Sequence, residues 1–528
     1  MTPPVSPPDA TALSAARRAR DLTVLRERRD PVDLVVIGGG ITGVGIALDA
    51  ASRGLETVLL EAHDLAWGTS RWSSKLAHGG LRYLASGDVG IARRSAVERG
   101  ILLSRTAPHL TRPLAQVVPV YRGTRPAHAV LPGLGFLAGT VLTRLARTRR
   151  RLLPGARIVG PARVADLVPG VRREGLLFGH VNWDCQLVDD ARLVVAVART
   201  AAREGATILT RTRAVAASGT EVTVRDELAG AEFALPARAV VNATGVWADE
   251  LAPGLRLRPS RGTHLVVRAE ALGHPTGALT VAVPGSTNRF CFCLPAENGR
   301  VFVGLTDVDA PGPVPDVPTP DDDEVDFLLD VVGRALARPL TRDDVIGTFA
   351  GLRPLVEAGA SVSAADTETA DLSREHAILT AANGLVTVTG GKLTEYRLMT
   401  EQVVDLVVGR LAGRAARPCR TADLPLVGAG RDGTPAPSGG EPLPAPLVAR
   451  FGAEAPAVVA ASLLDRPLDP VAQGLDVTRA EFSWAVTHEG ALDAGDVLDR
   501  RSRIGLVATD RSAAEPAARE ALRAAAGR

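Results

Sequence analysis

DLVVIGGGITGVGIALDAASRGLETVLLE, residues 33–61, contains every part of one βαβ nucleotide-binding unit in the required order. The apolar run Leu34–Ile37 predicts a first strand, and Thr57–Leu60 predicts a second strand that ends on Glu61. Between the two strands, apolar residues recur at helical spacing. Three glycines join the first strand to this helix in the pattern G-x-G-x-x-G, namely Gly38, Gly40 and Gly43.

The glycines and the acid have separate roles in such a unit. Gly38 permits the tight turn, Gly40 lets a pyrophosphate approach the backbone, and Gly43 lets helix and strand pack closely. The helix N-terminus offers N–H groups and a positive dipole to the phosphates. Glu61 follows Gly43 by 18 residues, where its carboxylate can accept hydrogen bonds from a ribose and disfavours a 2′-phosphate. The unit therefore predicts a bound dinucleotide.

The composition limits the fold and the partners. With 528 residues, the chain is long enough for two or three domains. The 61 Lys and Arg residues nearly balance the 59 Asp and Glu residues, which gives no support for nucleic-acid binding. The four cysteines have neither a disulfide framework nor a zinc spacing, so we expect a reducing compartment and no metal site. The cysteines are Cys185, Cys291, Cys293 and Cys419. Cys291 and Cys293 alternate as in a strand, which favours an apolar role for them.

The sequence predicts no membrane-spanning helix. Residues 1–30 form a Pro-rich and basic extension that lacks the apolar core of a secretory signal. No run reaches the roughly 20 apolar residues that cross a bilayer. The longest, Ala129–Leu142, is interrupted by Pro132 and is followed by five arginines within Arg144–Arg151. Such a segment can lie in a membrane surface. We therefore expect a cytoplasmic protein that binds the inner face of the cell membrane peripherally, with a solvated helix as the alternative.

Further strand-like segments are scattered along the chain. They are Ala206–Thr210, Ala239–Asn242, His264–Val267, Val301–Gly304 and Leu385–Thr389. One Rossmann-like domain built from distant segments, with a β-rich cap inserted between them, explains this pattern better than consecutive small domains. The expected fold class is α/β, with this discontinuous unit at 31–426, a linker at 427–446 and a C-terminal helical domain at 447–528.

Several motifs beyond the βαβ unit follow one another along the chain. They are Ser73–Leu84 (SSKLAHGGLRYL), Val188–Leu193 (VDDARL), Arg261–His264 (RGTH), Gly304–Asp307 (GLTD), Gly351–Leu355 (GLRPL) and Gly390–Arg397 (GGKLTEYR). In this order and spacing, the chain closely resembles the FAD-dependent, quinone-linked glycerol-3-phosphate dehydrogenases. The resemblance covers residues 33–410 and continues more weakly over 484–505. Thr42 and Glu395 depart from it, since Asn and Thr are usual there.

The resemblance implies an FAD-binding domain, oxidation of sn-glycerol 3-phosphate to dihydroxyacetone phosphate in glycerol catabolism, and electron transfer to quinone. Oxygen is the alternative acceptor, and the oligomeric state stays open, with a homodimer among the alternatives. The ADP half of FAD would bind the glycine loop and Glu61. Further cofactor contacts are expected at Thr69, Ser70, Ser74, Lys75, Gly79, Thr244, Gly245, Gly391, Lys392, Leu393 and Thr394.

A small dianionic substrate requires cationic donors. Arginine fits a phosphate bidentately, whereas lysine supplies a point charge. Composition cannot choose among 61 cations, but the motifs that match the family implicate five residues in substrate binding. These are Arg82, Tyr83, Arg353, Arg374 and Lys392. Arg353 in GLRPL is the leading candidate, with a bond to the phosphate or to the developing carbonyl oxygen.

Oxidation of an alcohol also requires a group that accepts the hydroxyl proton. A histidine whose pKa lies near the working pH suits this role. Of nine histidines, His264 and His78 lie in the matched motifs. We expect His264 to be the base and His78 to support the flavin, with the reverse assignment as the alternative. Arg353 completes the expected catalytic set.

Three other functions stay open from the sequence. Another FAD-dependent amino or hydroxy acid oxidase of the same fold would lack the phosphate-binding cluster. A non-catalytic flavin-binding scaffold would not be reduced by glycerol 3-phosphate. A protein that binds NAD in place of FAD would lack a flavin absorption spectrum.

Overall fold

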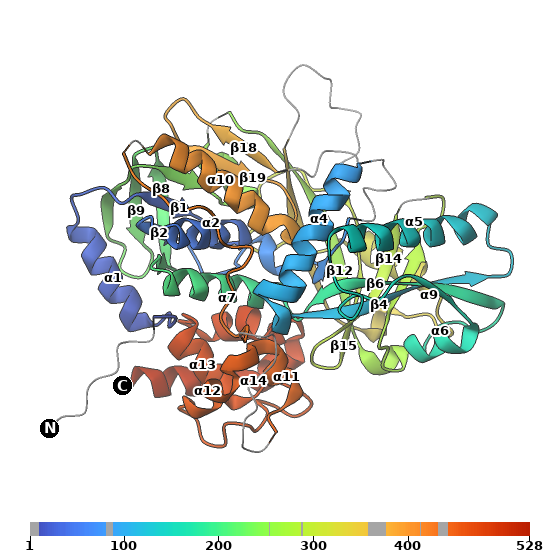
Figure 1. Ribbon diagram of the computed structural model, residues 1–528. Helices are drawn as coiled ribbons and strands as arrows, with labels where there is room; N and C mark the ends of the chain where they lie inside the picture. The colour runs from blue at the N-terminus through green and yellow to red at the C-terminus, as the bar shows by residue number, and fades with distance from the viewer. Residues whose placement is uncertain are drawn as a thin grey trace.

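The computed structural model describes residues 10–80, 88–252, 254–286, 289–356, 376–411, 413–430 and 442–527. Within these residues, the chain forms a nucleotide-binding part, a β-rich cap beside it, and a C-terminal helical part that lies against both (Figure 1). The cap is inserted into the nucleotide-binding part, because strands of the latter come from both ends of the chain. The α/β fold class expected from the sequence is confirmed.

The nucleotide-binding part is built on a sheet whose strands come from distant segments. Their order is β18 (Ala377–Thr380), β19 (Val386–Thr389), β11 (Val240–Asn242), β1 (Leu34–Ile37), β2 (Thr57–Leu60) and β7 (Thr207–Leu209). All neighbours are parallel except β18 and β19. Every residue of β1 is buried, as a parallel sheet covered on both faces requires.

Alternate residues of β1 enter two different cores. Leu34 and Val36 pack in the core with helices α2 (Ile41–Ser52), α7 (Asp190–Arg203) and α10 (Tyr396–Arg410). Val35 and Ile37 pack in a second core with a small antiparallel sheet and the N-terminal helix. These elements are β8 (Thr212–Ala217), β9 (Glu221–Asp226), β10 (Glu232–Pro236) and α1 (Ala15–Glu27).

The cap is a large twisted sheet with helices on one face and along its edge. Its strand order in the described residues is β16 (Val308–Asp309), β12 (Leu257–Arg268), β15 (Arg300–Gly304), β14 (Phe290–Ala296), β13 (Ala278–Ala282), β4 (Thr111–Tyr121), β6 (Leu176–Leu187) and β3 (Leu76–Ala77), while β17 (Val345–Val356) pairs with β12 and β5 (Arg157–Val159) with β6. Helices α6 (Pro161–Leu167) and α9 (Asp322–Gly333) cover the core face. Helices α4 (Val89–Ile101) and α5 (Pro126–Leu145) contact each other, and α5 contacts β6.

The C-terminal part contains α11 (Ala445–Phe451), α12 (Ala455–Ala460), α13 (Arg479–His488) and α14 (Ala508–Ala526), drawn in red in Figure 1. A π-helical turn, η11 (Asp496–Arg501), and a 3₁₀ turn, η12 (Ile504–Leu506), connect α13 to α14. Helices α13 and α14 and the turns between them share one apolar core, and α11 and α12 pack with α13 in a second one. The four cysteines are free, and Cys291 and Cys293 are buried in β14 as the alternating pattern predicts. The segment 431–441 of the expected linker lies outside the described residues.

Candidate functional site

A cavity of about 2200 Å³ lies between the two sheets. The carboxyl ends of β1, β2, β11 and β19 supply one wall, and side chains of the cap supply the other. In open α/β sheets, ligands bind at this end of the strands. The volume exceeds the roughly 300–1000 Å³ of an ordinary small-molecule pocket, so a dinucleotide and a small substrate have room together.

The glycine turn after β1 forms one end of the cavity. Gly38 has φ +110°, and a Cβ there would lie 2.6 Å from the carbonyl oxygen of Ala243. A Cβ on Gly43 would lie 1.9 Å from the carbonyl oxygen of Gly38, so only glycine permits this helix–strand contact. Residues 38–42 line the cavity and present the N-terminus of α2 to it. This geometry fits a phosphate.

Glu61 lies beside this turn at the end of β2. Its carboxylate oxygens accept the backbone N–H groups of Gly39 at 2.6 Å and His63 at 2.7 Å. Burial raises the pKa of Glu61, and these two hydrogen bonds oppose the shift. A carboxylate has about four acceptor positions, so positions remain for ribose hydroxyls. The structure thus fits the nucleotide half of a dinucleotide without a 2′-phosphate.

Most of the other residues expected to contact the cofactor also line the cavity. They are Thr69, Ser70, Ser74, Thr244, Gly245, Gly391, Lys392, Leu393 and Thr394. Gly391 has φ +84°, and a Cβ there would lie 2.5 Å from the sulfur of Met399. The chain therefore approaches the cavity with bare backbone at the ends of β11 and β19, which suits a flat, extended ligand.

Three expected cofactor residues, Gly43, Lys75 and Gly79, do not line the cavity. Lys75 is fully buried, and its Nζ donates to Asp190 and to the carbonyl oxygen of Arg71, both at 2.9 Å. Burial lowers the pKa of Lys75, while the charge of Asp190 opposes this. Direct contact of Lys75 with phosphate or flavin does not fit this structure, because the carboxylate holds the ammonium group behind the wall.

His264 lies in β12 and lines the cavity, with its ring fully buried. The ring stacks on Phe349 at 4.6 Å between centroids, with 9° between their planes. Its Nε2 lies 2.9 Å from the hydroxyl oxygen of Ser74. Gly304 makes room for it, since a Cβ there would lie 2.3 Å from the imidazole Cδ2. This imidazole is held in one orientation.

The electrostatics of His264 correct one expectation from the sequence. Burial, together with the charges of Lys75 and Arg353, lowers the pKa of His264 to about 3. The imidazole is therefore neutral throughout the physiological pH range. An ionisation near neutrality is not expected from it in the free protein.

Arg353 lies in β17 opposite Ser260 of β12 and lines the cavity. One guanidinium nitrogen donates to Ser260 Oγ at 3.1 Å and Asp307 at 3.2 Å, and the other donates to the carbonyl oxygen of Thr306 at 3.2 Å. Gly262 provides the space, because a Cβ there would lie 2.3 Å from the guanidinium. The RGTH, GLTD and GLRPL motifs thus meet at one side chain.

Lys392 lines the same cavity from the segment after β19. Its Nζ lies 3.4 Å from Ser95 Oγ of α4 and 3.3 Å from Glu395 Oε1. Glu395, the departure from the family motif, therefore places a negative charge beside Lys392. We expect it to weaken the attraction of Lys392 for a dianion.

His78 also lines the cavity, and its side chain is half exposed. Its Nδ1 lies 3.8 Å from Asp184, which Arg99 binds at 2.6 Å. Burial alone would raise the pKa of Asp184, but Arg99 and His78 lower it to about 2. Gly79 donates its N–H to the same carboxylate at 3.2 Å. Arg82, Tyr83 and Arg374 lie outside the described residues.

The sequence reasoning missed several residues of the cavity wall. His376 lines it and follows Arg374 in the SREH segment. This motif could therefore have predicted His376 as well. His63, Trp67, Trp72 and Arg213 line the wall without a motif that distinguishes them. Leu131, Leu134 and Phe136 of α5 line it too. In the part of the chain that the structure describes, no group of His, Cys, Asp and Glu could hold a metal ion.

Comparisons with known proteins agree with this geometry. Residues 33–397 match the family model for FAD dependent oxidoreductases, and residues 419–527 match that for the C-terminal domain of alpha-glycerophosphate oxidase. The chain is 56% identical to glycerol-3-phosphate dehydrogenase 1 of Mycobacterium tuberculosis (strain ATCC 25618 / H37Rv), over 98% of this chain and 99% of that protein. It is 34% identical to aerobic glycerol-3-phosphate dehydrogenase of Staphylococcus aureus (strain MRSA252), over 76% of this chain and 72% of that protein. The structure of glycerol-3-phosphate dehydrogenase from Bacillus halodurans, complexed with FAD, is similar with a TM-score of 0.71 and 26% identity, over 97% of this chain and 96% of that chain.

Proposed function

Because the chain belongs to the family of FAD-dependent glycerol-3-phosphate dehydrogenases, we propose that it oxidises sn-glycerol 3-phosphate to dihydroxyacetone phosphate and passes the electrons to a quinone. FAD is its cofactor. The observation that carries the proposal is the set of side chains around the cavity. Arg353, Lys392 and a buried neutral His264 line the same space as the dinucleotide-binding turn. One cavity thus combines cations that can bind the substrate, a base and the cofactor site.

The residues that would hold FAD divide into two groups. The glycine turn and Glu61 would bind the ADP half, and the backbone at Thr244, Gly245 and 391–394 would bind the remainder. When bound, FAD supplies the acceptor for the hydride that leaves C2 of the substrate. Lys75, Gly43 and Gly79 would act from behind the wall, since they contact Ser73, Gly38 and Asp184, which line it.

His264 is our candidate for the proton acceptor. As the C2–H bond breaks and the carbonyl forms, the proton of the C2 hydroxyl moves to a ring nitrogen of His264. If Nε2 is the basic atom, there are two routes, since Ser74 Oγ lies 2.9 Å from it. Either Ser74 passes its own hydroxyl proton to Nε2 as it takes the substrate proton on Oγ, or it yields its place to the substrate hydroxyl. His78 is the alternative base, because it lines the same cavity.

Arg353 is our candidate for the anion-binding residue. Its guanidinium has forked donor geometry, and its contacts with Ser260, Asp307 and Thr306 aim it across Gly262. A dianionic substrate would compete with Asp307 for this cation. Lys392 adds a second positive charge, reduced by Glu395. Arg82, Tyr83 and Arg374 remain proposals from the family motif.

The proposal of a quinone acceptor and a membrane surface rests on α5. The exposed face of this helix carries Val130, Leu131, Leu134, Leu137, Val141 and Leu145, each more than half exposed. Leu131 and Leu134 also line the cavity, so its wall reaches the apolar surface. A helix of this kind can lie in a bilayer interface beside Arg147–Arg151. In the part of the chain that the structure describes, no helix is long and apolar enough to span a membrane.

We further propose that the reaction serves glycerol catabolism on the cytoplasmic side of the membrane. The oligomeric state, with a homodimer among the alternatives, stays a prediction. Anaerobic mixing of the purified flavoprotein with glycerol 3-phosphate tests the central claim. We expect stoichiometric bleaching of the flavin absorption, inhibited competitively by inorganic phosphate. Bleaching by an amino or hydroxy acid without phosphate competition would support the oxidase alternative, and no bleaching would support a scaffold.

A further inference from the structure

The segment 500–503 of the C-terminal part lies against the outside of the cavity wall. Arg500, Arg501 and Arg503 are each less than a tenth exposed. Their contacts cross to the loop that follows β2, which contains Asp64, and to the backbone of Arg71. This loop begins at Glu61 and supplies many lining residues of the nucleotide end. The C-terminal part is therefore in contact with the FAD site from behind.

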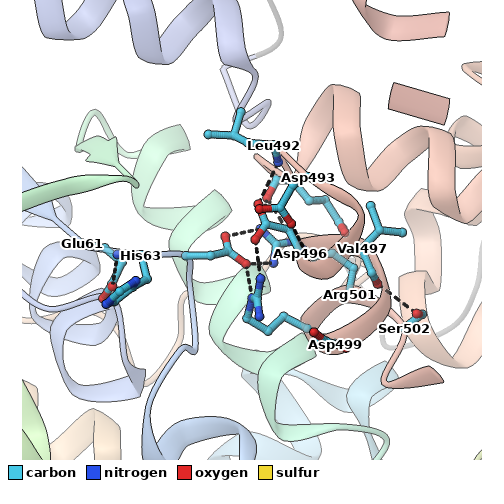
Figure 2. A network of polar contacts seen from close by, with 12 residues as sticks. Glu61, His63, Leu492, Asp493, Asp496, Val497, Asp499, Arg501 and Ser502 are labelled. Atoms are coloured by element: carbon cyan, nitrogen blue, oxygen red, sulfur yellow. Dashed lines mark hydrogen bonds and ion pairs between the residues drawn. The ribbon is translucent and has the colours of Figure 1, made fainter. Parts of the chain in front are cut away.

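Asp64 is the first point of attachment. It is fully buried and accepts from Arg500 Nε at 2.5 Å and from the two terminal nitrogens of Arg501 at 2.7 and 2.8 Å. Burial alone would raise the pKa of Asp64, but the two arginines lower it well below its ordinary range. Asp496 also accepts from Arg500. Figure 2 shows Arg501 and Asp496 of this network in one view with Glu61 and His63. Asp64 follows Glu61, the proposed ribose contact, by three residues.

Two tryptophans of the wall are the second point of attachment. Trp67 stacks on His63 at 4.4 Å, and the guanidinium of Arg500 lies 5.0 Å from its ring. The guanidinium of Arg503 lies 4.9 Å from the Trp72 ring. Arg71 lies between the two rings, 5.1 Å from Trp67 and 4.3 Å from Trp72. Cations over aromatic faces are attracted most strongly when both are shielded from water.

Arg71 is buried in an unusual environment for an arginine. It is 2% exposed and makes no ion pair within the described residues. Burial, with the charges of Arg500 and Arg503, lowers the pKa of Arg71 to about 9. An arginine held there without a carboxylate partner destabilises the fold unless the two aromatic faces compensate. Arg71, Arg500 and Arg503 thus pack against Trp67 and Trp72, and both tryptophans line the cavity.

We infer that the C-terminal helical domain is a positioning element of the FAD site, which acts through Arg500 and Arg501 on Asp64 and through Arg500 and Arg503 on the two tryptophans. The loop from Glu61 to Trp72 is then held in its ligand-binding shape by residues more than 400 positions away in the chain. None of these arginines need touch FAD. The inference concerns cofactor retention and is independent of which substrate is oxidised.

The test compares two variants that each weaken one ion pair between the C-terminal part and the rest of the chain. Arg501→Lys keeps the charge but cannot bind both oxygens of Asp64. Glu454→Gln removes the charge of the carboxylate that Arg199 binds at 2.8 and 2.9 Å, while Arg199 keeps Glu489 at 4.0 Å. Neither Arg199 nor Glu454 lines the cavity. FAD affinity is measured by fluorescence during reconstitution of the apoprotein, and stability by thermal unfolding of both forms.

We expect Arg501→Lys to weaken FAD binding by roughly ten- to a hundredfold, from the loss of a charged hydrogen bond that orders the loop. Glu454→Gln should lower the unfolding temperature and leave FAD affinity unchanged. Equal FAD affinity in wild type and Arg501→Lys, or equal weakening in both variants, would overturn the inference. If Arg501→Lys does not fold, Asp64→Asn carries the same test, because Arg501 keeps its bond to the carbonyl oxygen of Glu489 at 2.7 Å.

Discussion

Replacement of His264 by alanine tests the proposed base and its unusual environment together. The change removes a fully buried ring that stacks on Phe349 and contacts Ser74. Loss of a general base slows its step by about a hundred- to ten-thousandfold. Truncation of a buried side chain of this size also costs about 2–5 kcal/mol of stability. Both effects should be present in His264→Ala, so the kinetic effect must be separated from the structural one.

The assay is stopped-flow flavin reduction by glycerol 3-phosphate under anaerobic conditions, with Phe349→Leu as the matched control. Phe349→Leu removes the stacked ring but keeps the imidazole, so it should destabilise the protein and slow reduction much less. Since burial lowers the pKa of His264 to about 3, reduction in the wild type should show no His264 ionisation between about pH 5 and 9. Unimpaired reduction in His264→Ala would refute the assignment, and a large loss in His78→Ala alone would transfer the role to His78.

Four further predictions concern the cofactor, the substrate, the membrane and pH. Glu61→Ala should weaken FAD retention by roughly ten- to a hundredfold, measured after dilution and gel filtration, because a charged acceptor for the ribose is lost; full flavin occupancy would contradict it. Arg353→Lys should raise KM for glycerol 3-phosphate more than it lowers kcat, because the charge remains and the fork does not; an unchanged KM would exclude Arg353 as the anion-binding residue. Leu137→Glu with Val141→Glu should abolish flotation with anionic liposomes and leave anaerobic flavin reduction intact, since both side chains are more than half exposed; flotation equal to that of the wild type would show that α5 does not bind lipid. The free energy of unfolding should fall as the pH falls from about 6.5 towards 4, because burial lowers the pKa of His109 to about 4 and only the unfolded chain takes up that proton. Urea unfolding of His109→Gln should show a weaker dependence of this free energy on pH. The same pH dependence in both proteins would exclude His109 as a source of it.

The nucleotide-binding part could be predicted from sequence because its signals are local. The positive φ of Gly38, the contact of Gly43 with Gly38 and the position of Glu61 are all set within one βαβ unit. The substrate end of the cavity is different, because His264 and Arg353 could be predicted there only from motifs that resemble those of a known family. The structure then shows why they belong together, since β12 and β17 pair along their whole length and bring RGTH beside GLRPL.

The errors and omissions have one physical origin, which is that burial and long-range pairing decide what a charged side chain does. Lys75 follows two serines near the nucleotide end, yet Asp190, 115 positions later, draws its ammonium group behind the wall. The sequence suggested a histidine that titrates near neutrality, but the packing of Phe349 and nearby cations keeps His264 neutral. Arg500, Arg501 and Arg503 resemble many other arginines in a chain with 61 cations, and only the fold shows them against Asp64 and the tryptophans. If these arginines order the FAD loop, loss of the C-terminal helical domain should reduce flavin affinity even in variants whose cavity residues are all intact.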